Sequence, residues 1–154
     1  MPTRNLPYSQ FNFTVDIQDS DADPATLAGG FQEVSGIGLE VNMVEYRNGN
    51  FPDNNVMIVP GLGKTADVTC KRGIFGSDVL YKWLDAIRRG TRDQGRHVKV
   101  SLLSEDRQDV VHTWTLRNAR ISKYTSGPFN AKGNDVAMEE LVLKCEQVLM
   151  DSGQ

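Results

Sequence analysis

The sequence has few of the residues that disulfide frameworks and metal sites require. Of its 154 residues, two are cysteines and two are histidines. Cys70 and Cys145 lie far apart and in no C-x-x-C pattern, so the simplest interpretation is two small, buried hydrophobic residues in a reduced protein. A disulfide remains an alternative if their strands are neighbours. A zinc site on His97 and His112 would need further ligands at shorter spacing.

The chain also lacks a strong charge bias and long hydrophobic runs. Its 17 basic and 20 acidic residues give a formal net charge of −3, whereas a nucleic-acid-binding domain usually carries a basic excess. No segment approaches the ~20 apolar residues that span a bilayer, and residues 1–5 do not open a secretory signal. We therefore expect synthesis and assembly in the cytoplasm. Later release inside a particle would need no signal of its own.

One segment imitates a nucleotide-binding loop. Gly63-Lys64-Thr65 copies the end of a Walker A motif, but Ile58 occupies the position of the first glycine. The motif must also open a helix, and the residues after Lys64 alternate in polarity instead, which predicts a half-buried strand. We conclude that the motif is accidental.

Other candidate sites also fail on spacing. Three aspartates between Asp19 and Asp23 lack the glycine and glutamate of a calcium loop. The adjacent Glu139 and Glu140 would point to opposite faces of a strand, so they cannot act as an acid–base pair. Lys71-Arg72 at a strand end is typical of a solvated pair or of one matched by a carboxylate. We expect no enzymatic activity, no cofactor and no metal.

Most of the chain shows the two-residue period of β-strands. The strands expected from this period are Asn12–Gln18, Phe31–Ser35, Val41–Arg47, Val56–Val59, Ala66–Lys71, His97–Ser104, Asp109–Ala119, Ile121–Tyr124 and Val136–Leu149. Pro60 is expected to end the fourth strand, and a bend to separate the seventh and eighth. Neither face of Val41–Arg47 is purely apolar, which suggests that its second face meets a partner or a lumen.

The last expected strand is the longest. Its apolar face would hold Ala137, Leu141, Leu143, Cys145 and Leu149. Between the strands, residues 19–30, 48–55 and 126–135 have the composition of turns and loops.

A single segment has a helical period. Leu80, Trp83, Leu84 and Ile87 form one apolar stripe. Ser77 is a good N-cap and Gly90 can adopt the left-handed conformation that ends a helix. Many strands and one helix predict a mainly β fold, an antiparallel sandwich or barrel with the helix covering one face or end. The length of the chain predicts one domain, residues 1–154.

The order and spacing of several short segments resemble the tail-tube family of contractile phage tails and related contractile injection systems. These segments are Phe11-Asn12-Phe13, residues 30–36, Val44-Glu45-Tyr46-Arg47, Pro60-Gly61-Leu62, residues 68–73, Trp83-Leu84, residues 114–119 and residues 130–137. The resemblance covers nearly the whole chain and includes the tube-like Hcp proteins of type VI systems.

The resemblance implies a structural subunit rather than an enzyme. Similar proteins form hexameric rings that stack into a hollow tube inside a contractile sheath, and strands of neighbouring subunits join into one inner wall. The implied partners are other copies of the chain, the sheath protein, baseplate and tube-cap proteins, and a luminal cargo of protein effector or DNA.

Two loops are the expected contacts between subunits or rings, because loops tolerate change when few core contacts depend on them. The expected contact residues are Asn48, Phe51 and Asn54 in the first loop and Phe129, Lys132 and Asn134 in the second. Two alternatives stay open: a tube-initiator ring at a baseplate, and a monomeric β-barrel that binds a small ligand in an apolar pocket.

Overall fold

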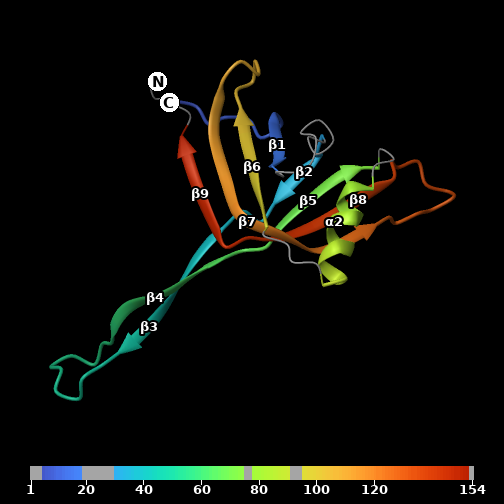
Figure 1. Ribbon diagram of the computed structural model, residues 1–154. Coiled ribbons are helices and arrows are strands. Elements are labelled where there is room, and N and C mark those ends of the chain that lie inside the picture. The colour runs from blue at the N-terminus through green and yellow to red at the C-terminus, as the bar shows by residue number, and fades with distance from the viewer. Residues whose placement is uncertain (1–4, 19–29, 75–77, 91–94, 153–154) are drawn as a thin grey trace.

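The computed structural model describes residues 5–18, 30–74, 78–90 and 95–152 (Figure 1). In these residues the strands are β1 (Phe13–Gln18), β2 (Glu33–Ser35), β3 (Leu39–Tyr46), β4 (Met57–Thr65), β5 (Val68–Gly73), β6 (Arg96–Leu103), β7 (Val110–Ser126), β8 (Met138–Lys144) and β9 (Gln147–Ser152), and the helix is α2 (Val79–Arg88). All strand pairs are antiparallel. The expected mainly β, antiparallel fold is confirmed.

Seven strands form one sheet that folds over on itself. Their order is β1-β6-β7-β8-β5-β2, with β9 also paired to β7. The first part of β7 pairs with β6 and β9, and its last part pairs with β8. Long strand β7 therefore turns from one four-stranded layer, β1-β6-β7-β9, into the other, β7-β8-β5-β2 (Figure 1). β1 and β2 are the two ends of this order and do not pair.

The turn from one layer to the other occurs at Asn118. This residue has a φ of +51°, in the left-handed region that asparagine tolerates better than most residues. Glu146, on the neighbouring chain segment, donates its backbone N–H to the carbonyl oxygen of Arg117 at 3.0 Å. Its carboxylate accepts a hydrogen bond from the Asn118 side-chain amide at 2.8 Å. These contacts hold the corner of the fold.

The same corner divides the expected strand Val136–Leu149, so that prediction is wrong. The ladder stops at Lys144 and resumes at Gln147, which leaves two residues at the bend. Across this bend the inward positions change from odd to even residue numbers, since Leu141 and Leu143 are buried in β8. Val148 is buried, whereas Leu149, expected inside, is 42% exposed.

Both layers contribute to a single core. It consists of Val15, Ile17, Val68, Cys70, Leu80, Trp83, Val98, Val100, Leu116, Ala119, Ile121, Leu141, Leu143 and Val148. The alternation in β5 is as expected: Val68 and Cys70 are buried, and the residues that follow each of them, Thr69 and Lys71, are half-buried. Ala66, expected on the same face, is exposed because β5 begins only at Val68.

Helix α2 closes one end of this core against β7. The expected stripe is confirmed: Leu80 and Trp83 are buried and Leu84 and Ile87 pack against them. The Arg96 guanidinium lies 4.4 Å from the centre of the Trp83 ring. The helix begins after Asp78, and the expected N-cap Ser77 lies outside the described residues. Gly90 has a φ of +86°, as its place after the helix predicted.

Strands β3 and β4 form a separate two-stranded hairpin that projects from the body (Figure 1). The expectation that Pro60 ends its strand is wrong, because β4 continues to Thr65. Pro60 pairs with Met43 beside a register shift between Val41 and Met43. An edge or bulge position leaves no ladder hydrogen bond for proline to lose. In the described part of the chain, no helix is long and apolar enough to cross a membrane.

Candidate functional site

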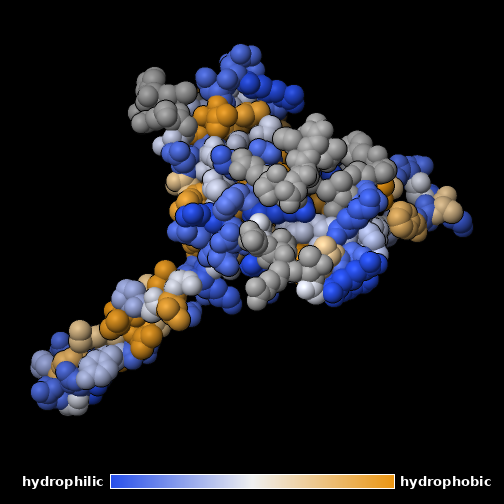
Figure 2. Space-filling model, in the orientation of Figure 1, coloured by the Kyte–Doolittle hydropathy of each residue, from blue (hydrophilic) through white to orange (hydrophobic). Residues whose placement is uncertain are grey.

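The projecting hairpin, residues 39–65 and called the arm below, is apolar yet exposed to solvent. Every residue of β3, and every residue of β4 except Thr65, is exposed. Figure 2 shows hydrophobic side chains gathered along it. The large exposed hydrophobic residues of the arm are Leu39, Val41, Met43, Val44, Tyr46, Val56, Met57, Ile58, Val59 and Leu62. Contiguous exposed apolar surface of this kind marks an interaction site.

Both faces of the arm are apolar. Residues directly opposite in an antiparallel pair share a face. Val44 pairs with Val59 and Tyr46 with Met57, which makes one apolar face. The other face carries Met43 opposite Pro60, and Ile58 opposite Glu45. An ordinary half-buried strand has one apolar and one polar face, so the arm is built to be covered on more than one side.

The expected contact residues of the first loop lie at the tip of the arm. Asn48 accepts a hydrogen bond from the Tyr46 hydroxyl at 2.5 Å, and its carbonyl oxygen accepts one from the Phe51 N–H at 3.2 Å. Arg47 donates to the carbonyl oxygen of Asp53 at 3.3 Å. Asn48 and Asn54 are exposed and Phe51 is half-buried. The tip is thus an ordered turn, stabilised by hydrogen bonds among its own polar groups.

The second loop lies between β7 and β8 and projects from another side of the body (Figure 1). Phe129 is 72% exposed, and Lys132 and Asn134 are exposed. The backbone N–H of Lys132 donates to the Asn130 side chain at 3.0 Å, which shapes the turn. The two sets of expected contact residues are therefore separate surfaces and do not form one site.

The contact residues expected from the sequence lie in the loops and leave out most of this apolar surface, although the mixed faces of Val41–Arg47 had indicated a partner or a lumen for one of its strands. Its signal is present in the sequence: the mixed faces of Val41–Arg47 and the unbroken apolar run Val56–Val59. Both features mark strands with no clean core face. The assumption that Pro60 ends the second strand concealed that the two segments pair into one hairpin.

A buried polar cluster lies in the core. Arg72 and Glu139, opposite one another in β5 and β8, form an ion pair and are 4% and 3% exposed. The Tyr124 hydroxyl also donates to Glu139, and the Phe31 ring covers the Arg72 guanidinium at 5.6 Å. Burial, and secondly the Glu139 carboxylate, raise the pKa of Tyr124. Of the two alternatives for Lys71-Arg72, solvated or matched by a carboxylate, the structure shows the second, since Lys71 also lies 3.9 Å from Glu33.

The remaining reactive side chains are dispersed. His97 pairs with Gln18 and His112 with Leu102, so the histidines are not neighbours. Across the described ranges no cluster of three or more histidine, cysteine or acidic residues could hold a metal. Both cysteines are free, and burial raises the pKa of the Cys70 thiol to about 12. Lys64, in the false Walker motif, lies in β4 opposite Glu40.

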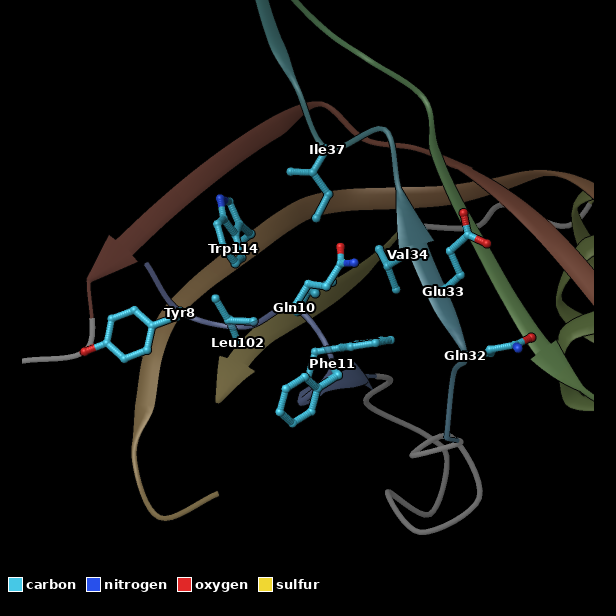
Figure 3. A pocket seen from close by; sticks show the side chains of 11 residues that line it. Tyr8, Gln10, Phe11, Gln32, Glu33, Val34, Ile37, Leu102 and Trp114 are labelled. Atoms are coloured by element: carbon cyan, nitrogen blue, oxygen red, sulfur yellow. The ribbon is translucent and has the colours of Figure 1, made fainter. Parts of the chain in front are cut away.

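A hollow of about 860 Å³ opens where the sheet fails to close between β1 and β2 (Figure 3). In Figure 3, Leu102 and Trp114 come from the adjacent strands β6 and β7, and Ile37 approaches from the segment that follows β2. It is called the seam hollow below. Its lining consists of Tyr8, Gln10, Phe11, Phe13, Gln32, Glu33, Val34, Ile37, Val100, Leu102 and Trp114. The lining is mixed: the side chains from β6 and β7 are apolar, whereas Gln10, Gln32 and Glu33 add polar groups near β2 and the N-terminal segment.

Comparison with known proteins identifies the family. The family described as T4-like virus tail tube protein gp19 matches residues 9–149. No curated protein matches the chain. A structure described as the sheath-tube complex of an extracellular contractile injection system, PVC, in its extended state is similar at 26% identity and a TM-score of 0.82. The match covers 96% of this chain and 93% of that one.

Two further structures share the fold. The tube-terminating cap of the anti-feeding prophage is 24% identical, with a TM-score of 0.84 over 98% of this chain and 95% of that one. Hcp1 from Flavobacterium johnsoniae is 10% identical, with a TM-score of 0.54 over 92% and 95% of the two chains. The expected tube-like fold is confirmed. The family match over residues 9–149 shows that the chain belongs to the T4-like virus tail tube protein family, whose members are structural proteins and not enzymes.

Proposed function

We propose that this protein is the main inner-tube subunit of a contractile phage tail or contractile injection system. Hexameric rings of the chain stack into a tube around a lumen through which cargo, a protein effector or DNA, passes. Residues 1–154 act as one tube domain, and the protein works without a cofactor.

The observation that carries the proposal is the arm. Two-stranded hairpins are at best marginally stable alone in water, and this one exposes ten large hydrophobic residues. Covering a single valine, leucine or isoleucine side chain contributes about 1.5–3 kcal/mol. A ring or stack in which neighbouring copies cover the arm stabilises both the arm and the assembly.

Unpaired strand edges support closure of a ring. In the layer β1-β6-β7-β9, both outer strands have one edge that pairs with nothing in the described part of the chain. Free edges invite pairing with another chain. If β9 of one subunit pairs with β1 of the next, the layers of all subunits join into one closed wall, and no edge remains exposed.

The partners follow from the relatives. The PVC structure is a sheath-tube complex and the anti-feeding prophage structure is a tube cap, so we infer contacts with a sheath protein, with baseplate proteins and with a cap. Assembly takes place in the cytoplasm, before the finished particle is released. Asn48, Phe51, Asn54, Phe129, Lys132 and Asn134 remain our proposed contacts at the arm tip and at the β7–β8 loop.

Electron microscopy of the purified protein tests the proposal. We expect six-fold rings and tubes at high protein concentration, and tubes at lower concentration when baseplate and sheath components are added. Mass measured across the same concentrations should rise in steps of six subunits. A monomer at all concentrations, with no ring of this chain in complete particles, contradicts the proposal.

Two alternatives rest on specific observations. The likeness to a tube cap shows that one fold serves the shaft and the ends of such tubes, so a baseplate initiator ring is the nearest alternative. Copy number per particle separates them, because a shaft subunit is present in many rings and an initiator in one. The seam hollow favours a monomeric ligand-binding barrel, which predicts a stable monomer and leaves the apolar arm unexplained.

A further inference from the structure

We propose that charge orients the stacking of this protein, with a basic surface of one subunit lying against an acidic surface of a subunit in the next ring. The inference rests on the proposed tube function and assigns to it two surfaces that involve neither the arm nor the seam hollow. Three observations carry it. Basic and acidic residues gather at opposite ends of one layer, like charges face each other at the basic end, and several of these charges form no ion pair within the described part of the chain.

The basic surface lies at the corner of the fold and is called the basic corner below. Residues 117–123 of β7 and residues 144–146, at and after the end of β8, contain four basic residues and one acidic residue, a surplus of three positive charges in a chain whose net charge is −3. The four basic residues are Arg117, Arg120, Lys123 and Lys144, and the acidic residue is Glu146. Arg117, Lys123 and Lys144 are exposed, so they present this surplus at the surface of the subunit.

The fold keeps a repulsion at the basic corner. Arg120 lies directly opposite Lys144 in the β7–β8 ladder, and like charges at such positions destabilise a pair of strands. Glu146 contacts Arg120 at 3.5 Å and so offsets one of the two charges. Lys123 and Lys144 take part in none of the ion pairs formed among the described residues. An acidic partner would remove the repulsion that the subunit alone retains.

The acidic surface lies at the other end of the same layer and is called the acidic end below. The β6–β7 turn and the last residues of β9 contain Glu105, Asp106, Asp109 and Asp151, with Arg107 as the basic residue among them. All four carboxylates are exposed. The Arg107 guanidinium donates to the neutral Asn12 side chain at 3.0 Å. Asp106, Asp109 and Asp151 contribute to none of the ion pairs that the described ranges contain.

The two surfaces face opposite directions along the strands. β7 begins at Val110, beside the acidic end, and reaches the corner at Arg117, about 20–25 Å further on at the usual rise per residue of a strand. In Figure 1 the β6–β7 turn lies at the top and the corner near the label β7, where the arm leaves the body. In the closed wall proposed above, strand edges join subunits within a ring, so the strand ends face the rings on either side. The acidic end of one subunit therefore faces the basic corner of a subunit in the next ring.

A contact of this kind also gives the tube a direction. Two different surfaces of identical subunits meet head to tail, and such contacts repeat from copy to copy. A single exposed ion pair contributes little, but every subunit of a ring repeats this contact. Charge complementarity also acts against wrong partners, since two acidic ends or two basic corners repel each other. Rings therefore add in one orientation.

Charge reversal tests the contact from both sides. The basic-corner variant carries Lys123→Glu and Lys144→Glu, and the acidic-end variant carries Asp109→Lys and Asp151→Lys, all at exposed positions. We expect each variant to form rings and to give about tenfold fewer tubes, because like charges then meet between rings. Lys144→Glu by itself should not lower the free energy of unfolding, since it replaces a repulsion with Arg120 by an attraction.

Combining all four substitutions in one chain gives the sharpest result. Each contact then regains opposite charges with the signs exchanged, so tube yield should return to within about twofold of that of the unchanged protein. The matched control carries Lys82→Glu and Arg88→Glu on α2, which reverse the same number of basic residues. Both side chains are 71% exposed, so their ion pairs contribute little and the control should form normal tubes.

The outcomes separate this inference from the tube function. Normal tubes from either two-residue variant overturn the inference. A combined variant that stays as defective as the other two also overturns it, because the charges would then act on different partners, such as an acidic segment of the sheath protein or a nucleic acid at the basic corner. In each of these cases the unchanged protein still forms tubes and the tube function stands. No tubes from the unchanged protein contradict the tube function itself.

Cross-linking of the unchanged protein gives a test that requires no variant. A carbodiimide joins a lysine ammonium to a neighbouring carboxylate through an amide bond. In tubes mixed from unlabelled and ¹⁵N-labelled protein, we expect Lys123 or Lys144 to be joined to a carboxylate of the acidic end of a different copy, identified by its isotope mass. Isolated rings should lack these cross-links. Tubes in which both lysines are joined only to other carboxylates overturn the inference.

Discussion

The body and the arm of this protein are both built from strands rich in apolar residues, but these residues are buried in the body and exposed in the arm. In the body, alternate residues such as Val68 and Cys70 are buried while their neighbours face outward. In the arm, valine, isoleucine and methionine residues lie on both faces of the strands, and all of them are exposed. Apolar residues of a strand stabilise a structure only when other parts of that structure cover them and remove them from water. The body is covered by its own second layer and helix, whereas the arm must be covered by another molecule.

The body should lose the most stability when its buried ion pair is broken. Glu139→Ala leaves Arg72 charged and buried, and removing one partner of such a pair costs about 3–5 kcal/mol. Denaturant unfolding followed by circular dichroism measures this loss. Glu140→Ala is the matched control, since Glu140 lies next in sequence on the opposite face of β8, and we expect it to change the free energy of unfolding by less than about 1 kcal/mol. If both variants lose the same free energy of unfolding, the buried ion pair contributes no more to stability than an ordinary glutamate on the same strand.

A matched pair of leucines compares the two regions directly. Leu143 is fully buried in the body and Leu62 is 84% exposed on the arm. Leu143→Ala should lower the free energy of unfolding by about 2–5 kcal/mol because it leaves a cavity. Leu62→Ala should change the same quantity by about 0.5 kcal/mol or less. A large loss for Leu62→Ala in the monomer would mean that the arm folds back onto the body in solution.

The arm tip should affect assembly rather than folding. Phe51→Asp replaces a half-buried side chain at the tip, outside the core of the body, so circular dichroism should remain that of a folded protein. We expect a clear fall in tube yield by microscopy, because a charge buried between subunits is costly. Normal tubes would remove Phe51 from the interface, and a lost fold would place it among the residues that the body needs.

The smallest effect should come from the false nucleotide motif. Lys64→Ala removes an exposed lysine from β4, where its strand geometry cannot cradle a phosphate. We expect no ATP binding by calorimetry before or after the change, and no difference in unfolding. Saturable ATP binding by the unchanged protein that disappears in Lys64→Ala would show that the arm also has a ligand site.

Much of the fold was predictable from local patterns. The alternation in residues 68–71 and the stripe from Leu80 to Ile87 depend on neighbours in sequence, and both appear in the structure as expected. Two of the corrections share one cause. Pro60 and the Cys145–Glu146 corner are places where the partner strand decides whether the ladder continues, and the partner strand is distant in sequence.

The candidate contact surfaces also divide into those predicted from the sequence and those seen only in the structure. The arm tip and the β7–β8 loop were found from turn composition, whereas the apolar arm and the seam hollow were not. An exposed and a buried apolar strand have the same composition, so only the placement of β3 and β4 away from the core shows that the arm is uncovered.

Local sequence patterns account for the period of each strand, the helix and its apolar face, the absence of catalytic and metal-site spacing, and the likeness to tail-tube proteins. These properties depend on side chains a few residues apart, so they can be read without the fold. Three other features became visible in the folded chain: β7 turns between two layers, Arg72 meets Glu139 inside the core, and β1 and β2 leave a hollow between them. Each of these joins segments far apart in the chain, where the gain from burial is decided by the packing of the whole molecule.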